Sequence, residues 1–346
     1  MPFGDIDFNV IYQLALEQTV VGLVAAGLEH VTDIKIPQDI ALTFAGDALQ
    51  LEQRNNAMNY FIGVVVEKMS NVGISTVLVK GQGIAQCYER PMWRECGDVD
   101  FQFSKEDYKR AFNFLSPLAS NIGKEDAFKS HQALTIDPWE VELHGSLRSG
   151  LWKRIDNVLD EVYDEIFFHN SVRIWENGNL LVNLPNADED VVYVFAHILQ
   201  HFYKGGIGLR QTCDWCRLLW KYREAVDIQL LEKRLRKMGL MTEWKALSYL
   251  AVCFLNMPDQ SIPFYTPSRK WALKAELIMS RILETGNFGH NRDNSYRLKR
   301  GNIIKKIITF WYVTYDMLKT ARIFPKDSLK SWWIVLNNGL RAEVEV

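Results

Sequence analysis

A chain of 346 residues is about twice the length of a typical ~150-residue domain, so its length favours two packed lobes over one. Hydrophobic residues make up 48% of the chain and charged residues 24%, and this balance excludes disordered, collagen-like and coiled-coil proteins. The formal net charge of −2 excludes a strong overall attraction to nucleic acid or acidic lipid, so an anionic partner would have to be bound at a local site.

The N-terminal sequence and the cysteines favour a soluble, cytoplasmic protein. The first ten residues carry acids where a secretory signal has basic residues. The uncharged stretches are much shorter than the ~20 residues that span a bilayer, so we expect no transmembrane segment. Five cysteines are too few for a dense disulfide framework, and their odd number leaves at least one free thiol.

Residues 1–69 form a helical N-terminal segment by prediction. From Phe8 to about Met69 the apolar residues recur mostly at helical spacing, and a turn-rich sequence around Pro37 interrupts them.

Strand patterns define the next segment, residues 70–148, as an α/β core with one small mixed sheet. The predicted strands are Ile74–Val79, Asp98–Phe103, Gln132–Ile136 and Trp139–Leu143, the last two forming a hairpin around Asp137-Pro138. A short helix is expected over Gln82–Tyr88, and Ser104 is expected to cap a second helix.

Residues 149–346 are predicted to form a mostly helical C-terminal domain. A pair of short strands, Val172–Trp175 and Leu180–Leu184, interrupts it around a turn. The predicted helices are Asp188–Lys204, Leu209–Arg223, Gln229–Met238, Thr242–Leu255, Lys270–Glu284 and Ile303–Thr320. We therefore expect an α+β fold that is rich in helix.

The densest chemical signals lie between Lys80 and Asp100. A predicted strand runs directly into Lys80-Gly81-Gln82-Gly83, where a helix begins, so backbone N–H groups would converge as they do at anion sites. Asp98 and Asp100 are two residues apart on a predicted strand, so their carboxylates point to the same face. Adjacent ionised acids repel unless a cation lies between them, which favours Mg²⁺. A cation beside a phosphate-binding turn indicates phosphoryl or nucleotidyl transfer.

A third carboxylate would complete such a site. The predicted strand from Trp139 offers Glu140 and Glu142, and we favour Glu142 because the sequence beyond it stays polar while Glu140 lies at the turn. Glu142 would complete the metal site and help to deprotonate an acceptor hydroxyl.

At these residues the chain resembles the uncharacterised nucleotidyltransferase-like family of the polymerase-β-type nucleotidyltransferase superfamily. The matching positions are Val79-Lys80-Gly81, Tyr88, Arg94, Gly97-Asp98-Val99-Asp100, Glu142, His144, Ala196-His197, His201, Arg210 and Cys213-Asp214, within about residues 70–220. In the wider superfamily a Ser or Gly usually follows the glycine of the turn, whereas here the position is Gln82.

The resemblance implies a minimal nucleotidyltransferase α/β core with helical additions. It implies Mg²⁺ or Mn²⁺ held by Asp98, Asp100 and Glu142, and an NTP whose nucleoside monophosphate passes to an unknown acceptor. The candidate nucleotide or acceptor contacts are Lys80, Gly81, Gln82, Arg94, His201, Arg210 and Asp214.

Simpler interpretations compete with these functional ones. His197 and His201 lack the glutamate of a zinc-binding H-E-x-x-H helix, so packing or a nucleotide contact explains them better than zinc. Cys213 and Cys216 lack the second ligand pair of a structural zinc site, so they are interpreted as packed thiols. The basic stretch 269–306 is interpreted as a solvated face, and nucleic acid is not expected as a partner. Two further hypotheses remain open: a catalytically inactive binding or assembly protein, and a toxin-type enzyme that modifies protein hydroxyls.

Overall fold

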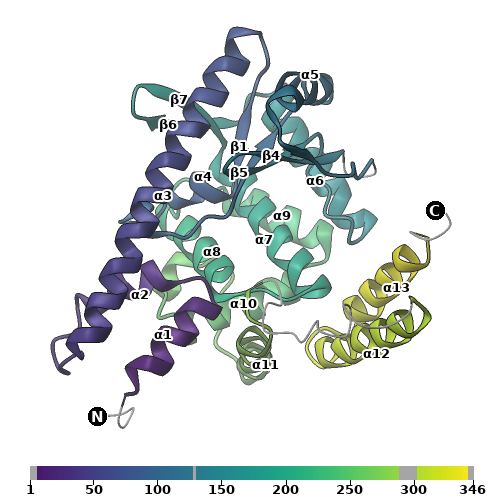
Figure 1. The fold of residues 1–346 in the computed structure, drawn as a ribbon. Coiled ribbons are helices and arrows are strands. Elements are labelled where there is room, and N and C mark those ends of the chain that lie inside the picture. The colour runs from purple at the N-terminus through teal and green to yellow at the C-terminus, as the bar shows by residue number, and fades with distance from the viewer. Residues whose placement is uncertain (1–5, 128–129, 288–301, 342–346) are drawn as a thin grey trace.

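The computed structural model describes residues 6–127, 130–287 and 302–341 and contains a seven-stranded mixed sheet, which lies in the upper part of the view in Figure 1. The strands are β1 (Val77–Val79), β2 (Asp98–Gln102), β3 (Asn121–Ile122), β4 (His131–Ile136), β5 (Trp139–His144), β6 (Val172–Asn177) and β7 (Leu180–Pro185). Their order is β3-β4-β5-β2-β1-β7-β6, with β2–β5 and β1–β7 parallel and the other pairs antiparallel. The predicted α+β class is confirmed.

The β6–β7 hairpin extends the sheet beyond the segment in which it was expected. Local sequence predicts this hairpin within residues 149–346, but β7 pairs with β1 through Val77 and Asn183. The sheet therefore includes strands from both sides of residue 148. Parallel neighbours such as β1 and β7 are far apart in the sequence, so local sequence patterns do not predict that they pair.

The N-terminal helices follow the prediction closely. They are α1 (Phe8–Glu17), α2 (Val21–Leu28) and α3 (Gln38–Asn71), and Pro37 immediately precedes α3. The side chain of Asp7 caps α1 by accepting hydrogen bonds from two backbone N–H groups of the first turn. The long helix α3 lies along one side of the molecule (Figure 1).

The two faces of the sheet are buried by different helices. Leu78, Phe101 and Leu143 pack on one face with Met58 and Ile62 of α3 and with residues of α5 (Lys105–Leu115). Val77 and Val79 belong to the second core cluster, which includes buried residues of α6 (Lys153–Phe168) and α7 (Ala187–Lys204). The polar residues of β2 and β5 alternate with the first set, so they lie on the face toward α6 and α7.

Most of the remaining described residues are helical, as predicted. The short α4 (Gly81–Ala85) follows β1, and the later helices are α8 (Leu209–Lys221), α9 (Ile228–Met238), α10 (Met241–Phe254), α11 (Arg269–Thr285), α12 (Asn302–Ala321) and α13 (Pro325–Arg341). Helix α6 was not predicted, whereas a terminal helix around Trp332-Trp333 was expected and is present as α13. Residues 288–301 of the basic stretch lie outside the described residues. Among the described helices, none combines the length and the apolar character that crossing a membrane requires.

Candidate active site

A strained turn joins β1 to α4 and forms one wall of the site. Lys80 has φ 58° and ψ −144°, and Gly81 has φ +36°, so both residues adopt conformations that most side chains avoid. A Cβ atom on Gly81 would lie 3.2 Å from the Cys96 sulfur and 3.5 Å from the carbonyl oxygen of Asp98. Glycine is therefore needed at position 81 both for its backbone conformation and for the close approach to the chain before β2.

Three carboxylates converge beside this turn. The parallel pairing of β2 and β5 places Asp100 directly opposite Glu142, and Asp98 lies two residues earlier on the same face of β2. One oxygen from each of the three carboxylates lies within 4.8 Å of the others. Hard oxygen ligands at this separation fit a divalent cation such as Mg²⁺ or Mn²⁺.

Lys80 balances the charge of the carboxylate cluster. Its ammonium nitrogen lies 2.6 Å from Asp100 Oδ1, and its side chain is 13% exposed while that of Asp100 is 2% exposed. Burial alone would lower the pKa of Lys80, but the negative charge of Asp100 and its neighbours raises it above the usual range. Lys80 is therefore charged at neutral pH and lies beside one of the oxygens that would bind a cation.

The carboxylates themselves differ in their protonation behaviour. The charge of Asp100, together with burial, raises the pKa of Asp98. Burial would also raise the pKa of Glu142, but hydrogen bonds from His131 and His144 hold it well below its usual range. Repulsion within the cluster is thus concentrated on Asp98, the acid at the more exposed end of β2.

Two histidines complete the polar surface on this side of the sheet. His144 Nε2 lies 2.9 Å from Asp100 Oδ1 and 3.3 Å from Glu142 Oε2, and His131 Nε2 lies 3.1 Å from Glu142 Oε2. The resemblance marks His144, whereas the sequence analysis missed His131 on β4. The signal for His131 is its cross-strand position opposite His144, which appears only once the hairpin register is known.

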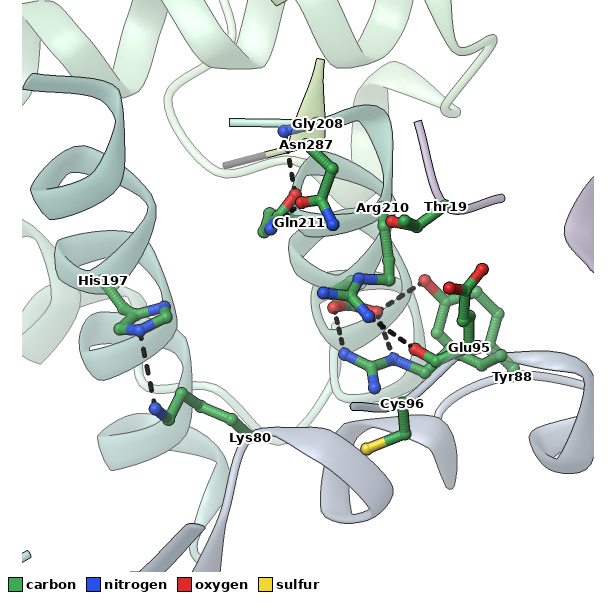
Figure 2. Close-up of polar contacts among 12 residues, drawn as sticks. Thr19, Lys80, Tyr88, Glu95, Cys96, His197, Gly208, Arg210, Gln211 and Asn287 are labelled. Atoms are coloured by element: carbon green, nitrogen blue, oxygen red, sulfur yellow. Dashed lines mark hydrogen bonds and ion pairs between the residues drawn. The ribbon is translucent and has the colours of Figure 1, made fainter. Parts of the chain in front are cut away.

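Helices α7 and α8 form the opposite wall of a cleft of about 130 Å³. Its lining includes Lys80, Gly81 and the three carboxylates from the sheet side, with His197, His201 and Arg210 from the helices. Figure 2 shows Lys80 reaching from the end of β1 toward His197, at 3.5 Å. Burial and the nearby Lys80 charge hold the pKa of His197 well below its usual value, so this imidazole is neutral at pH 7.

A buried ion pair fixes the end of the cleft near α8. Arg94 donates two hydrogen bonds to Asp214, at 3.0 Å and 2.6 Å, and the Tyr88 hydroxyl donates a third at 2.8 Å. Arg94 and Asp214 line the cleft, yet each is the other's main partner. Arg210 donates to the backbone carbonyl of Glu95 at 2.8 Å (Figure 2). These contacts connect α8 to the segment between α4 and β2.

Gln82 is oriented differently from the other residues of the turn. Its side chain is 1% exposed and donates to Asn55 Oδ1 of α3 at 2.7 Å, so its amide is engaged away from the cleft. The main-chain N–H of Gln82 lies in the first turn of α4, where N–H groups have no partner within the helix. A phosphate contact from Gln82 would therefore come from its backbone N–H group and not from its side chain.

The fold and the cleft define a helix-rich α+β protein whose sheet carries a carboxylate cluster beside a glycine turn. Comparison with protein-family models extends this description: residues 4–256 match the model of an uncharacterised nucleotidyltransferase family. The chain belongs to this family. Searches of curated proteins and of solved structures found no match.

Proposed function

We propose that the protein is a Mg²⁺-dependent nucleotidyltransferase that moves a nucleoside monophosphate from an NTP to an acceptor hydroxyl or phosphate. The observation that supports this most directly is the convergence of Asp98, Asp100 and Glu142, with ligand oxygens within 4.8 Å of one another. Mn²⁺ suits the same oxygen ligands.

The site residues predicted from the sequence have distinct proposed roles. Asp98, Asp100 and Glu142 would hold the cation, which when bound neutralises the phosphates and acidifies the acceptor hydroxyl. Lys80 and the backbone N–H groups of Gly81 and Gln82 would bind phosphate oxygens. His201 and Arg210 are candidates for contacts to the nucleotide or the acceptor, while Arg94 and Asp214 would shape the cleft through their ion pair.

In the proposed reaction the acceptor oxygen forms a bond to the α-phosphorus of the NTP. The bond from that phosphorus to the bridging oxygen breaks, and pyrophosphate leaves with the electron pair. Glu142 is ionised and would accept a hydrogen bond from the acceptor. Its low pKa makes it a weak base, so it would pass the acceptor proton onward to solvent.

Thermal unfolding in the presence of Mg²⁺ and each of the four common NTPs tests the proposal. We expect at least one Mg²⁺–NTP pair to raise the melting temperature of the wild-type protein and to leave that of Asp98→Asn with Asp100→Asn unchanged. Asp33→Asn with Asp39→Asn is the matched control, since both acids are exposed and lie before or at the start of α3. An equal rise in the site variant would refute the metal-binding role of these two aspartates.

Product analysis then separates the proposal from its alternatives. Release of pyrophosphate with a cell extract, together with a labelled small molecule, would support transfer to a small acceptor. Labelled protein bands would indicate a protein-modifying enzyme. Binding of Mg²⁺–NTP without pyrophosphate release across extracts would favour the inactive binding or assembly protein.

A further inference from the structure

A second set of metal-binding side chains adjoins the carboxylate cluster. His131, Glu142 and His144 each offer one ligand atom, and these three atoms also lie within 4.8 Å of one another. Glu142 belongs to both sets, whereas the two histidines belong only to this one.

The sheet fixes the positions of these three residues. His131 on β4 lies directly opposite His144 on β5, and Glu142 lies two residues before His144 on the same strand. All three side chains therefore project from one face of the hairpin. The two imidazole rings have their centroids 4.9 Å apart and are inclined by 37°. A site built on paired strands needs little reorganisation when a ligand binds.

Two of the three distances between the ligand atoms match those around a single ion. Metal–nitrogen and metal–oxygen bonds of ~2.1 Å place neighbouring ligand atoms ~3.0 Å apart at right angles and ~3.4 Å apart in a tetrahedron. Glu142 Oε2 lies 3.1 Å from His131 Nε2 and 3.3 Å from His144 Nε2.

The ligand types point to a different metal from the one at the carboxylates. Imidazole nitrogen suits Zn²⁺, Fe²⁺ and related ions, whereas Mg²⁺ prefers oxygen. Two histidines and one carboxylate also leave coordination positions open for water or substrate.

We infer that His131, Glu142 and His144 form a transition-metal site. This site adjoins the proposed Mg²⁺ site, and Glu142 is the one ligand that the two sites have in common. The shared carboxylate would bridge a histidine-bound ion and a carboxylate-bound ion. This bridging role rests on the proposed function, but binding of a transition metal by the three residues does not.

Cobalt binding to the full-length, metal-free protein tests the inference. Co²⁺ is the probe because its visible absorption reports nitrogen and oxygen ligation, and Zn²⁺ serves as the competitor. We expect one Co²⁺ per chain with this ligation, displaced by Zn²⁺ but not by excess Mg²⁺. His131→Ala should weaken binding at least tenfold, because it removes one of three protein ligands.

Two controls make the result specific. His169→Ala removes an exposed histidine that lies after α6 and pairs with Glu165, and it should leave Co²⁺ binding unchanged. Asp98→Asn removes an acid of the first set only, so it should weaken Mg²⁺-dependent NTP binding while Co²⁺ binding persists. Failure of the proposed function and failure of this inference therefore give different results.

Unchanged Co²⁺ affinity in His131→Ala would overturn the inference. So would loss of Co²⁺ binding in His201→Ala with retention in His131→Ala, because the ion would then lie at the His197–His201 pair on α7, whose Nε2 atoms are 3.1 Å apart.

Discussion

Replacing Lys80 by methionine should lower the melting temperature of the metal-free protein and increase the rise in melting temperature that Mg²⁺ produces. Methionine keeps an unbranched side chain of similar length but removes the ammonium that lies 2.6 Å from Asp100. Since both partners are largely buried, removing the ammonium leaves the Asp100 carboxylate with only its contact to His144, and we expect a cost of about 3 to 5 kcal/mol. At about 2 °C per kcal/mol for a chain of this size, the melting temperature in chelator should fall by roughly 6 to 10 °C.

Mg²⁺ should stabilise the Lys80→Met variant more than it stabilises the wild-type protein. In the wild-type protein the cation competes with the ammonium for Asp100, whereas in the variant it has no such competitor. A tenfold gain in Mg²⁺ affinity would add about 1.4 kcal/mol at saturating metal, or roughly 3 °C. Affinity for the NTP should fall, because a charge-assisted hydrogen bond to phosphate contributes about 1.5 to 3 kcal/mol.

Thermal unfolding in chelator and in excess Mg²⁺ measures both effects in one experiment. Lys109→Met is the matched control, since Lys109 is exposed on α5 and should respond little under either condition. A smaller rise in melting temperature with Mg²⁺ for Lys80→Met than for the wild-type protein would contradict competition between the ammonium and the cation for Asp100.

Three further predictions concern other parts of the structure. Gly81→Ala should cost about 1 to 2 kcal/mol because its φ is +36°, whereas Gly97→Ala, where a Cβ would meet nothing within 4 Å, should cost much less in thermal unfolding. Arg94→Met or Asp214→Leu alone should each cost about 3 to 5 kcal/mol in urea unfolding, because each leaves a buried charge unpaired. The double variant, Arg94→Met with Asp214→Leu, should be more stable than either single variant, and additive losses would contradict this. Burial raises the pKa of Glu243 from 4.5 to about 7, so its contribution to stability is complete below pH 4.5 and is lost as the pH rises through 7. In the wild-type protein the unfolding free energy should therefore fall by about 3 kcal/mol between pH 4.5 and 7, and Glu243→Gln should abolish this fall. Identical pH profiles of the two proteins would contradict the raised pKa of Glu243.

Local sequence patterns predicted most of the elements because helix periodicity and strand alternation are local properties. The helix predicted over Asp188–Lys204 begins in the structure at Ala187 and ends at Lys204. The hairpin around Asp137-Pro138 is also present. Helix α6 was not predicted, although Ile155, Val158 and Val162 are buried at helical spacing.

The site was predictable to the extent that it depends on spacing along one strand. Asp98 and Asp100 share a face because they are two residues apart, and the choice of Glu142 over Glu140 agrees with the convergence of ligand atoms. His131 and the orientation of Gln82 depend on pairing and packing between distant segments, which a single sequence does not encode in any local pattern. The ion pair between Arg94 and Asp214 joins residues 120 positions apart and was missed for the same reason.

The parallel pairing of β2 with β5 makes the chemistry and the hydrophobic core depend on one register. If β5 slipped by a single position against β2, Glu142 and His144 would turn toward α3 and α5, and the apolar Val141 and Leu143 would replace them in the cleft. Such a slip would bury charged side chains in the core and at the same time expose apolar side chains in the cleft. Selection for a stable interior therefore also preserves the alignment of the acids, and single-residue insertions or deletions within β5 should be tolerated far less well than changes in the loops around it.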